Sequence, residues 1–294
     1  MRLFIAGGTG FVGNHLTEEL LSRGHELVLL SHNRRSTSEK GVNYVTGDVT
    51  VPSGYAAALK GCDAVINLVG IIREFPARGI TFEHLHVEAT TGMVQATQQA
   101  GVLRYLQMSA LGTRVDAVSQ YHRTKWRAEE IVRGSGLAWT IFRPSLIFGP
   151  KDAFVNMLAA NLKLAPVMPT FGHGNYRLQP IHGRDVARCF ADALERPQTA
   201  GQTYELCGED RLTYRELLDA IAEALGKRHP FKPALPLRIM QPVIKALQGL
   251  ETFPITSDQL QMLLEESICN GCWQETFPFK PIRFKDGIRE YLGR

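Results

Sequence analysis

Tyr121 and Lys125 are four residues apart in a stretch with helical character, so both side chains are expected on one helix face. A free phenol has a pKa of about 10, which is too high for a base near neutrality. An ammonium group one turn away would favour the phenolate and lower that pKa. The pair therefore suits proton exchange with a bound substrate. The same spacing also fits two ordinary residues of an amphipathic helix.

A glycine-rich loop near the N-terminus has the spacing of a phosphate-binding turn. Gly7 permits a tight turn, Gly10 lets the backbone approach a pyrophosphate, and Gly13 lets a helix pack closely on a sheet. The helix that follows would offer unpaired N–H groups to the phosphate charge. A plain glycine turn is the alternative, but a strand precedes this loop and a helix follows it. The loop residues expected to bind a dinucleotide are Gly7, Thr9, Gly10, Phe11, Val12 and Gly13.

The end of the second predicted strand indicates which dinucleotide is bound. An NAD-preferring site usually has an acidic residue there, but this chain has none before Glu39. His32 is expected beside the nucleotide, and Arg34 and Arg35 could hold a 2′-phosphate through charge-assisted hydrogen bonds. The alternative is two solvated loop arginines. The sequence favours NADP(H), with NAD(H) as the second choice.

Alternating strands and helices must position these residues. Short apolar runs that predict buried strands cover residues 3–6, 27–30, 64–68, 105–108 and 139–142. Helices are predicted between them, over residues 12–23 closed by Gly24 and 83–100 closed by Gly101. This alternation predicts an α/β fold with a doubly wound parallel sheet.

The sequence changes character after Pro150. Eleven of the 15 prolines lie beyond it, and the clearest helix there is 214–225, with Thr213 as N-cap and Glu216 completing a capping box. We expect a dinucleotide-binding domain over residues 1–150. A smaller, irregular C-terminal lobe for substrate or partner should cover 151–294, with a return segment near 180–200 contributing to the first core.

Composition narrows the class of protein. The net charge of +4 is too small and dispersed to suggest nucleic acid, and hydrophobic residues at 44% fit a globular protein. No apolar run reaches the roughly 18 residues of a spanning helix, and the N-terminus lacks a signal-peptide pattern. A cytoplasmic protein is expected. Cys269 and Cys272 lack a second ligand pair for zinc and are expected to be unrelated thiols, with a redox pair as the alternative.

The motifs together resemble the short-chain dehydrogenase/reductase superfamily, especially its extended and atypical members. The glycine loop and Tyr121–Lys125 carry the resemblance, and four further segments support it in the expected order. These segments are Gly47-Asp48-Val49, Asn67-Leu68-Val69-Gly70, Arg143-Pro144 with the residues to Pro150, and residues 180–187. Within the superfamily, Ser109-Ala110-Leu111-Gly112 and residues 121–130 resemble the group containing the nucleotide-binding accessory subunit of respiratory complex I and its bacterial relatives.

The resemblance implies a Rossmann fold and roles for single residues. Tyr121 would exchange the proton, Lys125 would bind the nicotinamide ribose, and Ser109 would orient the substrate oxygen. Further cofactor contacts would come from Asp48, Val49, Leu68, Val69, Gly70 and Pro144. One departure is His86, which stands where extended members usually carry Asn, so a water relay at that position is not implied.

Two function hypotheses follow. The first is an NADP(H)-dependent oxidoreductase or epimerase acting on a small alcohol or carbonyl compound. The second is a non-catalytic nucleotide-binding assembly, accessory or sensor protein.

Residues 235–250 contain an apolar stripe on one predicted helix. Ile239, Met240, Val243, Ile244 and Leu247 share one side of a predicted helix whose only charges are Arg238 and Lys245. Pro242 is expected to kink or restart the helix. The stripe could contact an anionic membrane or a membrane-bound partner peripherally, or it could simply pack inside the protein.

Overall fold

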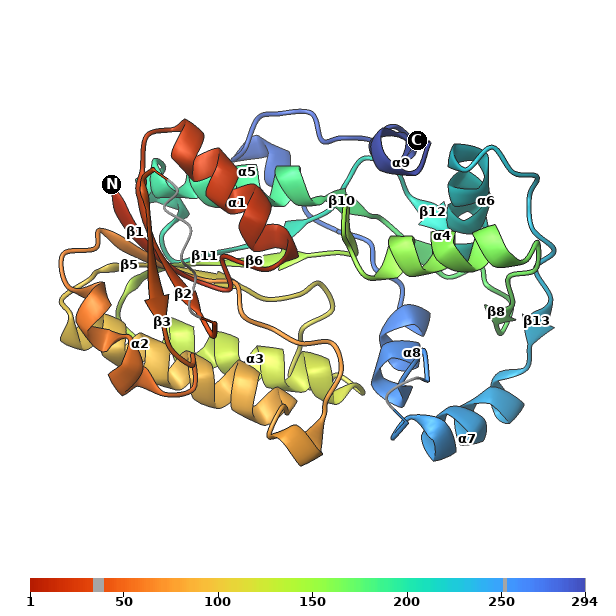
Figure 1. Cartoon of the computed structure of the whole chain (residues 1–294), viewed down its shortest axis with the longest axis horizontal. Helices are drawn as coiled ribbons and strands as arrows, with labels where there is room; N and C mark the ends of the chain where they lie inside the picture. The colour runs from red at the N-terminus through yellow and green to blue at the C-terminus, as the bar shows by residue number, and fades with distance from the viewer. Residues whose placement is uncertain (34–39, 251–252, 294) are drawn as a thin grey trace. The chain divides into compact units, whose positions relative to one another are not determined.

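The computed structural model describes residues 1–33, 40–250 and 253–293, and the chain divides into two compact units (Figure 1). Unit 1 comprises Met1–Pro144, Arg184–Glu205 and Glu275–Phe277. Unit 2 comprises Ser145–Gly183, Leu206–Gln274 and Pro278–Arg294. Each unit is described separately below.

Unit 1 is built on a seven-stranded sheet. The strands are β1 (Arg2–Ala6), β2 (Glu26–Ser31), β3 (Val42–Thr46), β4 (Ala64–Asn67), β5 (Arg104–Met108), β6 (Ala138–Pro144) and β11 (Gln202–Leu206). They follow the order β11-β6-β5-β4-β1-β2-β3, and the pairs from β6 to β3 are parallel. The chain order reverses between β1 and β4, which is the switch point where such sheets bind ligands. The predicted parallel α/β fold is confirmed.

Helices cover both faces of this sheet. Figure 1 shows α1 (Phe11–Ser22) and α5 (Gly183–Leu194) on one face, and α2 (Ala89–Gln99) and α3 (Gln120–Arg133) on the other. Sandwiched in this way, the central strands bury both faces: Leu3 to Ala6 are fully buried. Glycines at positive φ follow the predicted helix ends, at Gly24 and Gly101.

Three elements of unit 1 differ from expectation. One is strand β11, which is mostly half-buried and was not predicted. The predicted helix over 83–100 begins as a π-helix over Glu83–Glu88 and becomes α-helical only at Ala89. The strand β3 was not predicted, because as an edge strand it is only partly buried and its sequence lacks a continuous apolar run.

Unit 2 contains α4 (Phe154–Leu164), α6 (Tyr214–Ala224), α7 (Leu237–Leu247), α8 (Ser257–Leu264) and α9 (Phe284–Leu292). Its strands have two residues each and form three pairs: β7 (Ile147–Phe148) with β10 (Ile181–His182), β9 (Arg177–Leu178) with β12 (Leu212–Thr213), and β8 (Thr170–Phe171) with β13 (Ala234–Leu235). The core packs side chains of α4, α6 and α9 against Phe148. Thr213 and Glu216 form the predicted capping box of α6.

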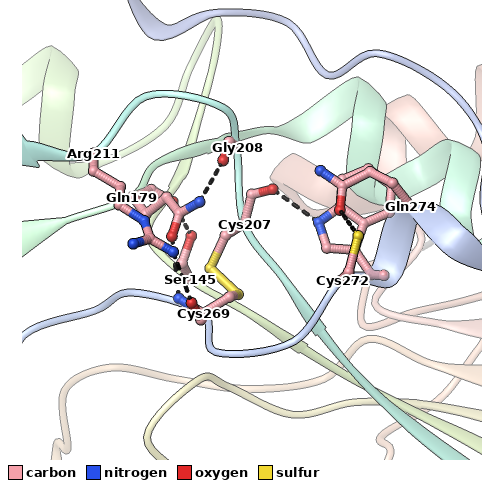
Figure 2. The surroundings of a disulfide bond; sticks show 9 residues. Ser145, Gln179, Cys207, Gly208, Arg211, Cys269, Cys272 and Gln274 are labelled. Carbon is pink, nitrogen blue, oxygen red and sulfur yellow. Dashed lines mark hydrogen bonds between the residues drawn. A yellow bond between two sulfur atoms is a disulfide. The ribbon is translucent and has the colours of Figure 1, made fainter.

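A disulfide within unit 2 shows that Cys269 and Cys272 are not bonded to each other, as expected, but that Cys269 is not a free thiol (Figure 2). Cys269 is bonded to Cys207, 62 residues earlier, whereas Cys272 is an exposed free thiol. The Gln179 side chain donates to Gly208 O at 2.7 Å and accepts from Cys269 N at 3.1 Å, so it holds both cysteine segments in place. The short Cys-x-x-Cys spacing was therefore uninformative, because the true partner is brought near by tertiary contacts.

The stripe on α7 is also arranged differently from the prediction. Pro242 does not end the helix, which runs continuously to Leu247. Ile244 is fully buried, but Ile239 and Val243 are exposed, so the five apolar residues do not act as one surface. None of the helices in the described residues is both long and apolar enough to cross a membrane.

Candidate nucleotide-binding and catalytic site

The glycine loop joins β1 to α1 and packs directly on the end of β4. Gly7 has a φ of 81°, and a Cβ there would lie 3.1 Å from the Leu68 carbonyl carbon. A Cβ on Gly13 would lie 2.2 Å from Gly7 O, so only glycine fits. At Gly10 a Cβ would meet only Gly7 O, at 3.2 Å, which leaves the other side of the loop open. These contacts are those of a turn that lets a ligand approach its backbone.

The N-terminus of α1 is suited to an anion. Gly10 is the N-cap and supplies no side-chain cap, and the first turn contains no acidic residue. Thr9, Phe11 and Val12 complete the loop, with Val12 buried under the helix. The partial positive charge of the helix end is therefore not neutralised by the protein at this position.

The turn after β4 is fixed by a buried amide. Asn67 is 1% exposed, and its side chain accepts a hydrogen bond from Val69 N at 3.0 Å and donates to Gln107 Oε1 at 3.1 Å. Leu68, Val69 and Gly70 are thereby held beside Gly7. A Cβ on Gly70 would lie 2.8 Å from Lys125 Nζ, so a larger residue there would displace the end of the lysine side chain.

The residues predicted to contact the adenosine part of the dinucleotide follow β2 and β3. Asp48 accepts hydrogen bonds from the backbone and hydroxyl of Thr50; burial raises the pKa of Asp48, but these bonds outweigh it and the net shift is downward. His32 is largely exposed, with Nδ1 4.0 Å from Asp48 Oδ2. Val49 is buried in the core of unit 1. Arg34 and Arg35, the residues predicted to select NADP(H), lie outside the described residues.

Lys125 lies at the carboxyl ends of β4 and β5. Its Nζ donates to Val69 O at 3.2 Å and to Met108 O at 3.3 Å. Burial lowers the pKa of Lys125 to about 8, although the nearby Glu129 carboxylate raises it. Glu129 is fully buried and pairs with Arg143 and Arg133, which ties α3 to β6.

Tyr121 begins the same helix one turn earlier, where Ser119 caps α3 by accepting from His122 N. Its ring contacts Phe82 and His86 edge-on, with centroids 5.8 and 5.4 Å away. The expected lowering of its pKa is wrong: burial raises the pKa of Tyr121 to about 12. The ammonium of Lys125 donates instead to the carbonyl oxygens of Val69 and Met108. The phenol is therefore protonated near neutrality.

Ser109 follows β5, and Pro144 is the last residue of the neighbouring strand β6. Ser109 is 4% exposed, with its hydroxyl 3.4 Å from that of Thr113, and its backbone N donates to Phe142 O. Pro144 is buried, and its carbonyl accepts from Leu111 N at 2.9 Å. Because Lys125 Nζ contacts Met108 O, Ser109 lies next to the lysine at the same sheet edge.

His86 is the residue whose role the sequence did not reveal. It projects from the π-helix, is 1% exposed, and accepts from Ile71 N at Nε2 (3.2 Å). Its Nδ1 therefore carries the proton and donates to Thr124 Oγ1 at 2.9 Å. Burial lowers the pKa of His86 to about 2, so the ring stays neutral and links the loop after β4 to α3. The sequence showed that His86 replaces the usual Asn, but it did not show the π-helix that orients the His86 ring.

The residues present fit a dinucleotide in unit 1. The uncapped α1 N-terminus faces a loop in which glycines replace side chains, and Lys125 and Ser109 lie at the edge of the sheet where β4 and β5 end. The described residues contain no group of three His, Cys, Asp or Glu able to hold a metal ion. The arrangement can bind a phosphate-bearing cofactor and donate a proton beside it.

Comparison with protein families shows to which family the chain belongs. Residues 7–197 match the family described as NAD(P)H-binding. The chain belongs to this family. The matched region includes the glycine loop, Ser109, Tyr121 and Lys125, and the short-chain dehydrogenase/reductase type predicted from the motifs is confirmed.

The family's curated relatives include respiratory-chain subunits. The chain is 30% identical over 264 residues to the mitochondrial NADH dehydrogenase [ubiquinone] 1 alpha subcomplex subunit 9 of Arabidopsis thaliana, covering 85% of this chain and 63% of that protein. It is 24% identical over 272 residues to the 40 kDa subunit of the NADH-ubiquinone oxidoreductase of Neurospora crassa, covering 90% and 71%. The chain thus spans less than two thirds of the Arabidopsis subunit.

Solved structures share the fold of this NAD(P)H-binding chain. A dTDP-glucose 4,6-dehydratase from Streptomyces venezuelae with NAD bound superposes with a TM-score of 0.77 at 21% identity, over 99% of this chain and 96% of that one. A UDP-glucose 4-epimerase from Thermotoga maritima gives 0.76 at 16% identity, over 99% and 97%. At these identities the likeness establishes the fold alone.

Proposed function

We propose that the protein is an NADP(H)-dependent oxidoreductase or epimerase acting on an alcohol or carbonyl compound, with Tyr121, Lys125 and Ser109 at the reacting end. The observation that supports this most directly is the position of Lys125 Nζ. It lies against the backbone after β4 and β5, one helical turn from Tyr121, in the unit that carries the glycine loop.

The glycine loop and α1 would bind the pyrophosphate, Asp48 and Val49 would contact the adenosine, and Leu68, Val69, Gly70 and Pro144 would border the nicotinamide. The nicotinamide would supply or accept the hydride. Lys125 would exchange its carbonyl partners for ribose hydroxyls, since its ammonium is a mobile point charge on a flexible stem.

Tyr121 would act on the substrate oxygen. A phenol with a pKa of about 12 holds its proton at neutral pH, so this site is better prepared to donate a proton than to remove one. Its hydroxyl has no hydrogen-bond partner among the described residues, which leaves it available to a ligand. Ser109 would hold the same oxygen in position. The chemistry therefore favours reduction of a carbonyl group.

Calorimetric titration with NADPH and NADH tests the cofactor assignment. We expect tighter binding of NADPH, and a loss of that preference when Arg34 and Arg35 are both changed to Ala. Replacing Lys163 and Arg228 by Ala removes the same charge from unit 2 and should leave the preference intact. Equal affinities in the wild type, or an unchanged preference in the double variant, would contradict NADP(H) selection by these arginines.

The second candidate is a nucleotide-holding accessory protein of a membrane-associated complex. It is favoured by the 30% identity to a subunit named as part of an NADH dehydrogenase. In that case the nucleotide would stabilise unit 1 without being turned over. A protein that co-purifies with NADP(H) and shows no oxidation or reduction with any carbonyl or alcohol panel would support it over the enzyme.

A further inference from the structure

Two side chains hold the backbone that follows β4, over residues 69–71. Lys125 Nζ donates to Val69 O at 3.2 Å. Two residues further along, Ile71 N donates to His86 Nε2 at 3.2 Å. Lys125 belongs to α3 and His86 to the π-helix that precedes α2. The segment is therefore held from two helices, by an ammonium at one end and by an imidazole at the other.

The hydrogen bonds of His86 continue into α3. A backbone N–H can only donate, so Nε2 accepts from Ile71 and the ring proton is on Nδ1, which is 2.9 Å from Thr124 Oγ1. The Thr124 hydroxyl accepts this bond and donates to the carbonyls of Gln120 and Tyr121, each 3.0 Å away. This chain of hydrogen bonds connects the backbone after β4 to the backbone of Tyr121.

Packing fixes the His86 ring in the same place. The ring is stacked on Phe82, with centroids 5.4 Å apart and planes inclined by 21°, and it meets the Tyr121 ring edge-on at 5.4 Å. His86 is 1% exposed and Thr124 is 6% exposed. Water therefore has little access to the bond between them, and the ring holds its partners at defined positions.

His86 stays uncharged although an ammonium is close to it. Burial, together with the nearby ammonium of Lys125, lowers the pKa of His86 to about 2. A second cation at this position would repel Lys125. The neutral imidazole can hold Ile71 without displacing the lysine.

Nucleotide binding would affect the two contacts differently. In the proposed function, Lys125 exchanges Val69 O for ribose hydroxyls, so that its hold on residues 69–71 is lost when the dinucleotide binds. His86 has both ring nitrogens engaged with the protein and makes no such exchange. Its contact with Ile71 is the one that remains.

We propose that His86 is a positioning residue for the nicotinamide half of the dinucleotide. Through Ile71 and Thr124 it would keep residues 69–71 in place while Lys125 turns to the ribose. The inference rests on the proposed function, since it requires a dinucleotide at the glycine loop. It also explains why a histidine replaces the usual Asn: imidazole reaches Thr124 with Nδ1 and Ile71 with Nε2, whereas Asn has no atom at the position of Nε2.

Calorimetric titration with NADPH and with 2′,5′-ADP, which lacks the nicotinamide half, tests the proposal. His86→Asn keeps a polar atom beside Thr124 but cannot reach Ile71 N, and it should weaken NADPH binding by about tenfold, the effect of one lost hydrogen bond. The affinity for 2′,5′-ADP should not change. His86→Gln places an amide oxygen close to the former position of Nε2 and should restore most of the NADPH affinity.

Hydrogen exchange of the Ile71 amide in the NADPH-bound protein, followed by NMR, gives a second measurement. His86→Asn removes the acceptor of that amide and should raise its exchange rate by about tenfold. His86→Gln should bring the rate back toward the wild-type value.

Control variants separate positioning from a general loss of structure. Thr124→Val removes the acceptor of His86 Nδ1 and should weaken NADPH binding, whereas Thr97→Val removes a fully buried hydroxyl from α2 and should not. His25→Asn changes another buried histidine of unit 1, next to the amino end of β2, and should bind NADPH like the wild type. Melting temperatures show which variants are folded; if His86→Asn unfolds, the comparison of Thr124→Val with Thr97→Val decides.

Three outcomes would overturn this role for His86: unchanged NADPH affinity in His86→Asn, equal losses of affinity for NADPH and 2′,5′-ADP, or Ile71 exchange that His86→Asn leaves unaltered. In each of them the wild type still binds NADPH, so the proposed function stands. A wild-type protein that binds neither ligand would overturn both the proposed function and this inference.

Discussion

In unit 1, the residues that meet at the site come from segments that end at neighbouring strands of one sheet. The glycine loop follows β1, the Asn67 turn follows β4, and Ser109 follows β5. In unit 2, contacts that hold the structure join distant segments of loop. The disulfide from Cys207 to Cys269 and the Tyr291 hydroxyl on Asp152, 139 residues away, are examples.

The two units differ in how much of their structure a short sequence motif can predict. A parallel sheet brings the carboxyl ends of its strands together whatever the loops contain, so local patterns in unit 1 predict a joint site. The strands described in unit 2 have two residues each, and its distant segments are joined by side-chain pairs that no local pattern reveals. Chemistry is therefore expected to respond to changes in unit 1, and stability and surface contacts to changes in unit 2.

The largest expected effect is on turnover. With a carbonyl substrate that the wild type reduces, Tyr121→Phe should lower kcat by on the order of a hundredfold or more, because it removes the proton donor. Calorimetry should show nearly unchanged NADPH affinity. Tyr204→Phe, which removes a hydroxyl from an aromatic cluster of unit 1, is the control and should retain activity. A fully active Tyr121→Phe protein would make the tyrosine structural and favour the accessory role.

The next effect is on unit 2. Under oxidising conditions, Cys207→Ser should lower the free energy of unfolding of that unit by about 2–4 kcal/mol, since it opens a long covalent loop. Denaturant titration measures this, and Cys272→Ser, which changes the exposed free thiol, should have little effect. NADPH binding should be unaffected. If Cys207→Ser weakens nucleotide binding as much as it weakens folding, the two units do not behave separately and the comparison fails.

The smallest effect is a pH dependence in unit 1. Burial lowers the pKa of Lys125 to about 8 from an ordinary 10.5, so Nζ is charged below pH 8 and neutral above it. NADPH affinity should fall above pH 8, by at most about tenfold per pH unit. Stability without nucleotide should instead rise between pH 8 and 10, because the unfolded chain then binds the additional proton.

Lys125→Met should flatten both profiles. In the wild type, NADPH affinity should fall with pH while stability rises. A general loss of structure at alkaline pH would instead lower both the affinity and the stability. The rise in stability should stop above pH 10, since the raised pKa of Tyr121, about 12, makes the folded state lose stability as pH increases from there.

The sequence predicted those features that depend on local geometry. The glycine loop, five of the seven strands of the central sheet and the capping box at Thr213 were recognisable from spacing. The edge strands β3 and β11 were not predicted, because half-buried strands lack a continuous apolar run. The raised pKa of Tyr121 was not predicted, because it depends on burial by Phe82 and His86, which belong to another segment of the chain.

Surface assignments in unit 2 were the least predictable. The stripe on α7 was correctly recognised as apolar, but periodicity alone could not say that Ile244 faces inward while Ile239 and Val243 face outward. The continuity of the helix through Pro242 was equally hidden. Cys269 is bonded to a cysteine 62 residues away, and no local spacing rule reveals such a pairing.

The π-helix over Glu83–Glu88 has a consequence for how the chain tolerates changes in length. Its wider turn holds one residue more than an α-helical turn, so residues before it are displaced around the axis by about 100° relative to a continuous α-helix. Deleting one residue there would let the segment relax to α geometry without breaking the helix. Phe82 would then rotate away from Tyr121, while Met93 and Val94 of α2 kept their place in the core. Insertions and deletions at this point would therefore change the contact between Phe82 and Tyr121 without changing how α2 packs in the core.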